Sequence, residues 1–194
     1  MAGILQRKFI IFFVVILGAA VVFGVCGGRQ NAENSADGWY APGTYKVGVD
    51  IPAGEYYAQS VGGIEGFFKI NSTKSFKDCQ IKCWNNFNNS VYFTVDEGDS
   101  LTVNYADFIK AEDAPQAKVG EDQYAENSYK IGKDLPAGDY ELLPVEDGAK
   151  YSVEKNSLHT SDSVIDESEI TKRVNIKLID GQYISFNNAV LIRE

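Results

Sequence analysis

The sequence predicts an all-β protein with two tandem homologous small domains, β-sandwich or barrel-like, after an N-terminal apolar helix. The phrase YKVGVDIPAGEY, residues 45–56, returns as YKIGKDLPAGDY, residues 129–140. Residues 91–109 match residues 174–192 without a gap, and apolar and polar residues alternate in both blocks. A period of two is typical of strands that bury one face. Because helix signals are nearly absent, repeated strands favour a sandwich or a barrel.

Residues 1–26 are expected to be a signal or anchor segment. Arg7 and Lys8 precede an unbroken run of apolar residues and glycine, residues 9–25. A membrane-spanning helix needs about 20 residues and a secretory signal core about 7–15, so the run lies between the two lengths. Three outcomes stay open: a retained membrane helix, a cleaved signal, or a lipoprotein signal that places a lipid on Cys26. The basic residues keep the N-terminus inside, so the remaining chain is expected outside the cytoplasm.

The rest of the chain divides into four parts. Residues 27–38 form a polar tether, residues 39–110 the first β domain, residues 111–123 a linker, and residues 124–194 the second β domain. The copies match at a spacing of 83 to 84 residues, which indicates duplication of a whole structural unit. At roughly 70 residues, each copy has the size of a small independent domain.

The repeated phrase predicts a tight corner in each copy. Pro52 suits the first central position of a type I turn, and Gly54 can follow in a left-handed conformation. Asp50 is placed to accept hydrogen bonds from turn amides. The same three positions in the second copy are occupied by Asp134, Pro136 and Gly138.

The second repeated block predicts a β-hairpin in each copy. Residues 91–105 and 174–188 each contain two alternating runs, and Gly98 or Gly181 lies between the runs. A glycine between two alternating runs is typical of a hairpin turn. Weaker strand signals lie between the corner and this hairpin.

The repeated phrase also resembles a recurrent pattern, similar to YKVGKDIPAGEY, in extracytoplasmic proteins of Gram-positive bacteria. There the units stand singly or in tandem behind a lipoprotein signal or a membrane helix. The resemblance runs from about Tyr40 to the end of the chain. It implies a location at the cell surface and supplies no catalytic residues and no established function. This sequence keeps the positions of the pattern at Gly48, Asp50, Pro52, Ala53, Gly54 and Tyr56.

One short motif suggests an enzyme. GDSL, residues 98–101, resembles the motif that names a family of serine esterases, in which Ser100 would be the nucleophile. The one histidine, His159, has Asn156 where that family places an aspartate, and the second copy has Tyr183 in place of Ser100. A serine nucleophile needs an oriented base. A GDSL-type esterase is therefore the alternative hypothesis, and no catalytic residue is assigned.

Cys79 and Cys83 are a candidate disulfide, since a bridge is the natural state of two nearby cysteines outside the cytoplasm. Residues four apart on an extended strand lie roughly 13 Å from each other, so a bridge requires a turn between them. Two free thiols are the alternative. No metal site is predicted, because two thiolates need further ligands and no histidine is near in the sequence.

Four aromatic residues of the first copy are candidate ligand contacts. Exposed rings stack on sugars or anchor a protein partner, although many aromatic side chains of a small domain fill its core. Trp84 is the best candidate, because it lies in CWNNFNN among amide side chains. The other three are Phe87, Trp39 and Tyr40.

These observations predict a membrane-tethered cell-surface binding or spacer protein without catalytic activity, cofactor or metal. The formal net charge is −9, and −11 without Arg7 and Lys8, which disfavours nucleic acid and anionic lipid as partners. The expected partners are the membrane, through the N-terminal segment or a lipid, and a cell-envelope glycan or protein. A purely structural spacer is a further alternative. His159 is expected to be a surface residue.

Overall fold

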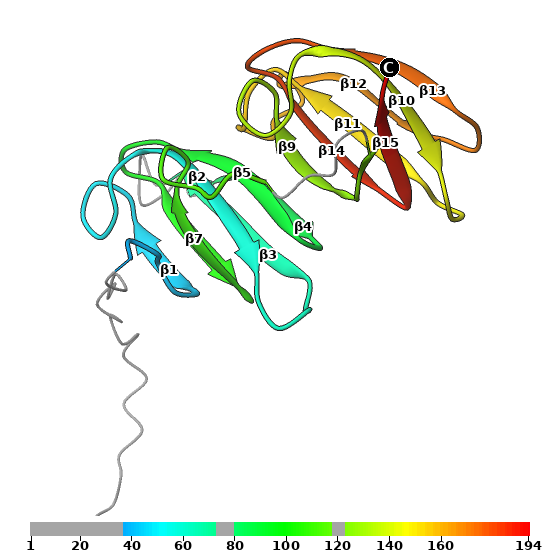
Figure 1. The fold of residues 1–194 in the computed structure, drawn as a ribbon. Helices are drawn as coiled ribbons and strands as arrows, with labels where there is room; N and C mark the ends of the chain where they lie inside the picture. The colour runs from blue at the N-terminus through cyan, green and yellow to red at the C-terminus, as the bar shows by residue number, and fades with distance from the viewer. Residues whose placement is uncertain (1–36, 73–79, 118–122) are drawn as a thin grey trace, which may run out of the picture.

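The computed structural model describes residues 37–72, 80–117 and 123–194 (Figure 1). These residues form antiparallel strands and no helix, so the predicted all-β class is confirmed. The predicted apolar helix, Cys26 and most of the tether lie outside the described residues. Within the described part of the chain, no helix is long and apolar enough to cross a membrane.

The strands fall into two groups along the chain. The first group is β1 (Gly43–Lys46), β2 (Gly54–Ser60), β3 (Gly66–Ser72), β4 (Gln80–Phe87), β5 (Ser90–Val95), β6 (Ser100–Asn104) and β7 (Ala106–Lys110). The second group is β8 (Gln123–Tyr124), β9 (Asn127–Lys130), β10 (Gly138–Pro144), β11 (Lys150–Glu154), β12 (Val164–Glu169), β13 (Val174–Leu178), β14 (Tyr183–Asn187) and β15 (Ala189–Arg193). We call residues 37–117 the N-terminal half and residues 123–194 the C-terminal half.

The two halves have the same strand order. In the N-terminal half the sheets run β1-β6-β3-β4 and β5-β2-β7. In the C-terminal half they run β9-β14-β11-β12 and β13-β10-β15, and β8 pairs with the outer side of β15. Tyr40, which forms an isolated antiparallel bridge with Phe108 of β7, takes the place of β8 in the N-terminal half.

In each half the core lies between the two sheets. Phe68 of β3 stacks on Phe93 of β5 with ring centroids 4.9 Å apart, and neither side chain is exposed. In the C-terminal half, Leu142 of β10 and Ile184 of β14 are buried in one cluster. Each cluster takes its residues from one half of the chain.

The predicted hairpins are wrong. β5 pairs with β2, whereas β6 pairs with β1 and β3, so the chain passes from one sheet to the facing sheet at residues 96–99. β13 and β14 are divided between sheets in the same way. The alternating pattern shows only that each strand buries one face. Two consecutive strands satisfy it equally well when they face each other across a core.

The repeated phrase closes a corner through its polar groups. Asp50 Oδ2 accepts a hydrogen bond from Lys46 N at 2.7 Å, and the hydrogen-bonded turn lies at residues 48–50. It therefore precedes the predicted turn. Pro52 lies in the link to β2, and Gly54 is the first residue of β2. Gly48 supplies the positive φ of 86° that this turn requires. The counterparts in the second copy are Lys130, Asp134, Pro136, Gly138 and Gly132.

The tyrosines at the ends of the phrase fix the corner to the chain before it. Tyr56 donates to Pro52 O at 2.7 Å, and Tyr140 donates to Pro136 O at 2.5 Å. Both rings are fully buried. The same bond four residues back is made by Tyr45 to Ala41 and by Tyr129 to Ala125.

We expect Tyr140→Phe to lower the free energy of unfolding by about 1 kcal/mol, because it removes one hydrogen bond and leaves the ring in place. Urea denaturation of the full chain in detergent micelles measures the change. Tyr105→Phe is the control, since 57% of Tyr105 is exposed. Equal stability of the two variants would contradict a structural role for the Tyr140 hydroxyl.

Candidate functional site

The two halves meet through the outer faces of two sheets. Tyr92 of β5 is fully buried, although its counterpart Asn175 is exposed. The Tyr92 ring lies 5.8 Å from Tyr183 of β14 and 5.1 Å from Tyr57 of β2. Its hydroxyl donates to Asp134 Oδ2 at 2.8 Å. Burial, together with the Asp134 charge, raises the pKa of Tyr92, so the hydroxyl stays protonated as a donor.

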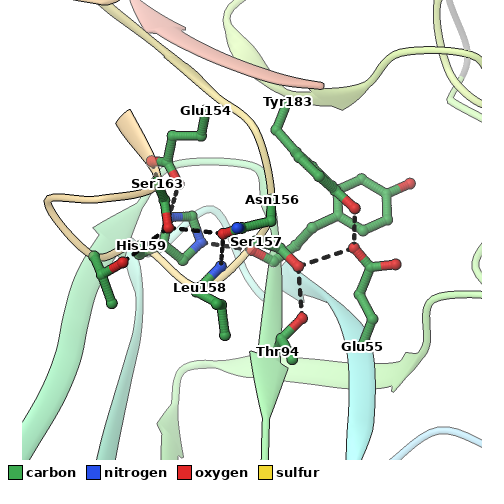
Figure 2. Close-up of polar contacts among 11 residues, drawn as sticks. Glu55, Thr94, Glu154, Asn156, Ser157, Leu158, His159, Ser163 and Tyr183 are labelled. Carbon is green, nitrogen blue, oxygen red and sulfur yellow. Dashed lines mark hydrogen bonds and ion pairs between the residues drawn. The ribbon is translucent and has the colours of Figure 1, made fainter. Parts of the chain in front are cut away.

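A polar cluster around Glu55 lies beside these rings (Figure 2). Glu55 accepts hydrogen bonds from Lys130 Nζ at 2.5 Å, from Ser157 Oγ at 2.9 Å and from the Tyr183 hydroxyl. Ser157 Oγ is also 2.8 Å from Thr94 Oγ1. Lys130, Ser157 and Tyr183 belong to the C-terminal half, so Glu55 joins the halves through three groups. Such a satisfied network fixes one arrangement of the two surfaces.

The loop between β11 and β12 extends over β5 of the N-terminal half. Ser157 O accepts from Thr94 N at 2.9 Å. Asn156 Oδ1 accepts from Leu158 N at 3.1 Å and from Ser163 Oγ at 2.7 Å, which closes the loop on itself (Figure 2). The loop is therefore held both by its own side chains and by β5.

The prediction that His159 is a surface residue is wrong, because only 10% of its side chain is exposed. Nε2 lies 2.6 Å from Tyr92 O, and Nδ1 lies 3.1 Å from the Glu154 carboxylate. Both neighbours accept hydrogen bonds, so both ring nitrogens donate when the imidazole is charged. Burial opposes this charge, but the hydrogen bond and charge of Glu154, with Tyr92 O, outweigh it and raise the pKa of His159.

A groove with a volume of about 510 Å³ lies next to this loop, between the two halves. Its floor is the outer face of the sheet β9-β14-β11. Ser128, Ser185 and Ser152 stand in register on these three strands and form a row across the floor. One wall is the amide-rich connection from β4 to β5. The volume lies within the range of roughly 300–1,000 Å³ for small-molecule sites.

Two polar atoms in the groove lining lack hydrogen-bond partners. Ser152 Oγ and Glu154 Oε2 are buried and accept or donate no hydrogen bond within the described residues. Glu154 Oε2 is still 3.1 Å from His159 Nδ1, so its charge is partly balanced. Ser152 Oγ has no such neighbour. An unsatisfied buried hydroxyl costs free energy that a bound polar group can recover.

The four predicted aromatic contacts have different environments. Trp84 is 61% exposed and lines the groove. Phe87 also lines it but is buried. Trp39 is half-buried, with its ring 6.3 Å from Tyr57. Tyr40 lies in the core, stacked on Phe108 at 5.0 Å, so its prediction as a ligand contact is corrected.

Cys83 is buried on β4 and has no disulfide partner among the described residues, and burial raises the pKa of its thiol to about 11. Its predicted partner Cys79 lies outside the described residues, so the disulfide stays a prediction. Gln80 to Cys83 lie in β4, and the pairing of this strand with β3 shifts register between Ile70 and Asn71. Elsewhere in the described residues, no three His, Cys, Asp or Glu side chains are grouped to hold a metal ion.

The GDSL residues serve the turn between β5 and β6. Asp99 is 2% exposed and accepts from Lys82 Nζ and Asp96 N, at 2.7 Å and 2.9 Å. No other described side chain hydrogen-bonds to the Ser100 hydroxyl, whereas both nitrogens of His159 are engaged elsewhere. The geometry therefore gives no support to the esterase hypothesis.

The serine row and the Tyr92 contacts were not predicted. The signal for them lies in the differences between the two copies. Tyr92 replaces the exposed Asn175, and Tyr183 replaces Ser100, at positions on the outer faces of the sheets. These differences mark the faces that meet.

The described chain is thus a protein of antiparallel β-sheets with a polar groove between its two halves. Comparisons with protein-family models, with curated proteins and with solved structures found no match to it.

Proposed function

We propose that the chain is a membrane-tethered cell-surface protein that binds a cell-envelope ligand without catalytic activity. Its two halves are tandem copies of one β-sandwich unit, and residues 1–26 or a lipid on Cys26 hold them outside the cytoplasm. The equal strand order of the halves and the repeated sequence support the duplication. The repeated phrase and the apolar N-terminal run support the location.

The groove is the observation that carries the binding function. It contains an exposed tryptophan and a buried hydroxyl without a partner, and neither Trp84 nor Ser152 is needed by a molecule that serves only as a spacer. Both lie in one cavity of about 510 Å³. Binding sites combine an aromatic surface with a few placed polar groups in this way.

We expect Trp84→Ala to weaken binding of the full chain to isolated cell envelopes at least tenfold, as removal of a central aromatic contact does. Glycan, peptidoglycan and envelope-protein arrays identify which component is bound. Tyr105→Ala is the control, because Tyr105 is as exposed as Trp84 and does not line the groove. Binding that is absent, or equal in both variants, would contradict a ligand site at this groove.

A structural spacer is the second candidate. The network around Glu55 joins the halves through Lys130, Ser157 and Tyr183, as a spacer of fixed length would require. Absence of any envelope ligand would favour this function over binding.

The esterase alternative is tested with chromogenic short-chain esters. We expect no turnover by the full chain and no difference for Ser100→Ala. Turnover that disappears in Ser100→Ala would overturn the non-catalytic proposal.

A further inference from the structure

We propose that the ligand of the groove is a neutral oligosaccharide that lies across the serine row and against Trp84. This inference rests on the proposed function, because it assigns a ligand class to the same groove. The floor, the amide wall, the tryptophan and the distribution of charge support it separately.

The floor presents hydroxyl groups in a row. Ser128, Ser185 and Ser152 are cross-strand neighbours, and their side chains point away from the core. A serine hydroxyl both donates and accepts hydrogen bonds, as a sugar hydroxyl does. Ser152 Oγ is buried and has no partner in the described part of the chain. A sugar hydroxyl would satisfy that group.

The wall presents carboxamides. Asn86 and Asn88 are exposed at the groove, so their amides are accessible to a ligand. Asn89 Nδ2 donates to Glu126 O at 2.9 Å, and Asn127 Oδ1 accepts from Ser90 Oγ at 2.7 Å. The second pair of amides thus fixes the wall to the C-terminal half. Each free carboxamide both donates and accepts, which matches adjacent sugar hydroxyls.

Trp84 supplies the aromatic surface. Its side chain is 61% exposed, and the Phe67 ring supports it from the neighbouring strand at a centroid distance of 6.5 Å. A large exposed ring in the lining of a polar groove suits the apolar C–H face of a sugar ring.

The charges of the lining exclude a polyanion. Lys150 is accompanied by Glu126, Glu154 and Glu167, and His159 is directed at Glu154 and Tyr92 O. Recognition of phosphate or carboxylate polymers uses clusters of arginine or lysine, which the lining lacks in the residues described. The formal net charge of −9 adds repulsion. The polar floor also offers no deep apolar pocket for the anchor residues of a peptide.

The test uses the full chain in detergent micelles with Trp39→Phe as the background, so that Trp84 is the remaining tryptophan. The probes are neutral oligomers of glucose and of N-acetylglucosamine, polyglycerol phosphate as the anionic polymer, and an extended polar peptide. Calorimetry measures affinity, and tryptophan fluorescence reports contact at Trp84. We expect a neutral oligomer alone to bind and to change the emission.

Two variants locate the ligand. Trp84→Ala is expected to weaken binding of the neutral oligomer at least tenfold. Ser152→Ala is expected to weaken this binding about fivefold, the factor for one lost hydrogen bond. The unfolding midpoint of Ser152→Ala without ligand should stay level or rise, because the hydroxyl has no partner to lose. A purely structural Ser152 would instead lower the midpoint and leave affinity unchanged.

The outcomes separate the two proposals. Binding of the anionic polymer or the peptide alone would overturn the neutral-glycan inference and leave the binding function in place. The neutral-glycan inference would also be overturned if no probe bound while binding to cell envelopes was still weakened by Trp84→Ala. The binding function would again stay in place. Binding of a neutral oligomer that neither variant weakens would place the ligand elsewhere and overturn the inference. Shorter fragments of the oligomer after incubation would overturn the non-catalytic function.

Discussion

Replacing Tyr92 with asparagine is expected to lower the free energy of unfolding by roughly 3–5 kcal/mol, the range for removal of a large buried aromatic side chain. Tyr92 is 0% exposed, and its ring packs against Tyr57 and Tyr183. The substitution also removes the hydrogen bond that Asp134 accepts. Because Asp134 Oδ1 already has no hydrogen-bond partner in the described residues, the variant leaves a poorly satisfied buried carboxylate.

The two halves are distinguishable in one experiment, because Trp39 and Trp84 both belong to the N-terminal half. Tryptophan fluorescence follows that half during urea denaturation, whereas circular dichroism follows all strands. We expect coincident transitions for the native chain and separated transitions for Tyr92→Asn. Asn175→Ala, at the exposed counterpart position, should change stability by less than about 0.5 kcal/mol. Coincident, unshifted curves for Tyr92→Asn would show that this contact does not couple the halves.

The same comparison of copies shows how the two faces that meet differ from their counterparts in the other half. The outer face that Tyr57 and Tyr92 form in the first copy carries Glu141 and Asn175 in the second. The face that Tyr183 contributes in the second copy carries Ser100 in the first. Tyr57, Tyr92 and Tyr183 therefore all stand on the two faces that meet.

The sequence predicted the fold class because alternation directly records which face of a strand is buried. Phe93 and Val103, for example, are apolar positions of the alternating block at residues 91–109, and both are buried. The partner strand was not predictable, since β5 and β6 satisfy the same pattern in one sheet or in two. The position of the turn in the repeated phrase was predicted wrongly for a related reason. Turn composition alone does not separate the turn at residues 48–50 from the bend at Ala53.

The candidate site was predictable only in part. Trp84 was identified because an aromatic residue among amides is unusual, and it does line the groove. The serine row was missed, because Ser128, Ser152 and Ser185 look like ordinary outward residues of strands far apart in the sequence. Their common environment depends on how the two halves meet. Local patterns do not specify that contact, and His159 was misplaced for the same reason.

Raising the pH is expected to weaken the contact between the halves through His159. Its charged form donates to both Tyr92 O and Glu154, and this environment raises its pKa above the ordinary value of about 6.5. A raised pKa in the folded state means that the stabilisation is complete below the unfolded pKa. It is lost as the pH rises through the folded pKa. Burial keeps the neighbouring Cys83 thiol neutral in this window, since its pKa is about 11.

The chain has one histidine, so one histidine resonance reports the folded pKa directly in NMR spectra. We expect this resonance to titrate above about pH 6.5. We expect the urea midpoint of unfolding to decrease as the pH is raised from about 6 to the pH at which the resonance titrates. Glu154→Gln should lower the pH at which His159 titrates. Burial still opposes the charge of the imidazole in this variant, and the negative charge of Glu154 no longer offsets that effect. His159→Gln keeps one donor for Tyr92 O and should remove this pH dependence. A resonance that titrates at or below about pH 6.5 would mean that the folded chain does not raise the pKa of His159. It would also mean that Glu154 does not stabilise the charged imidazole.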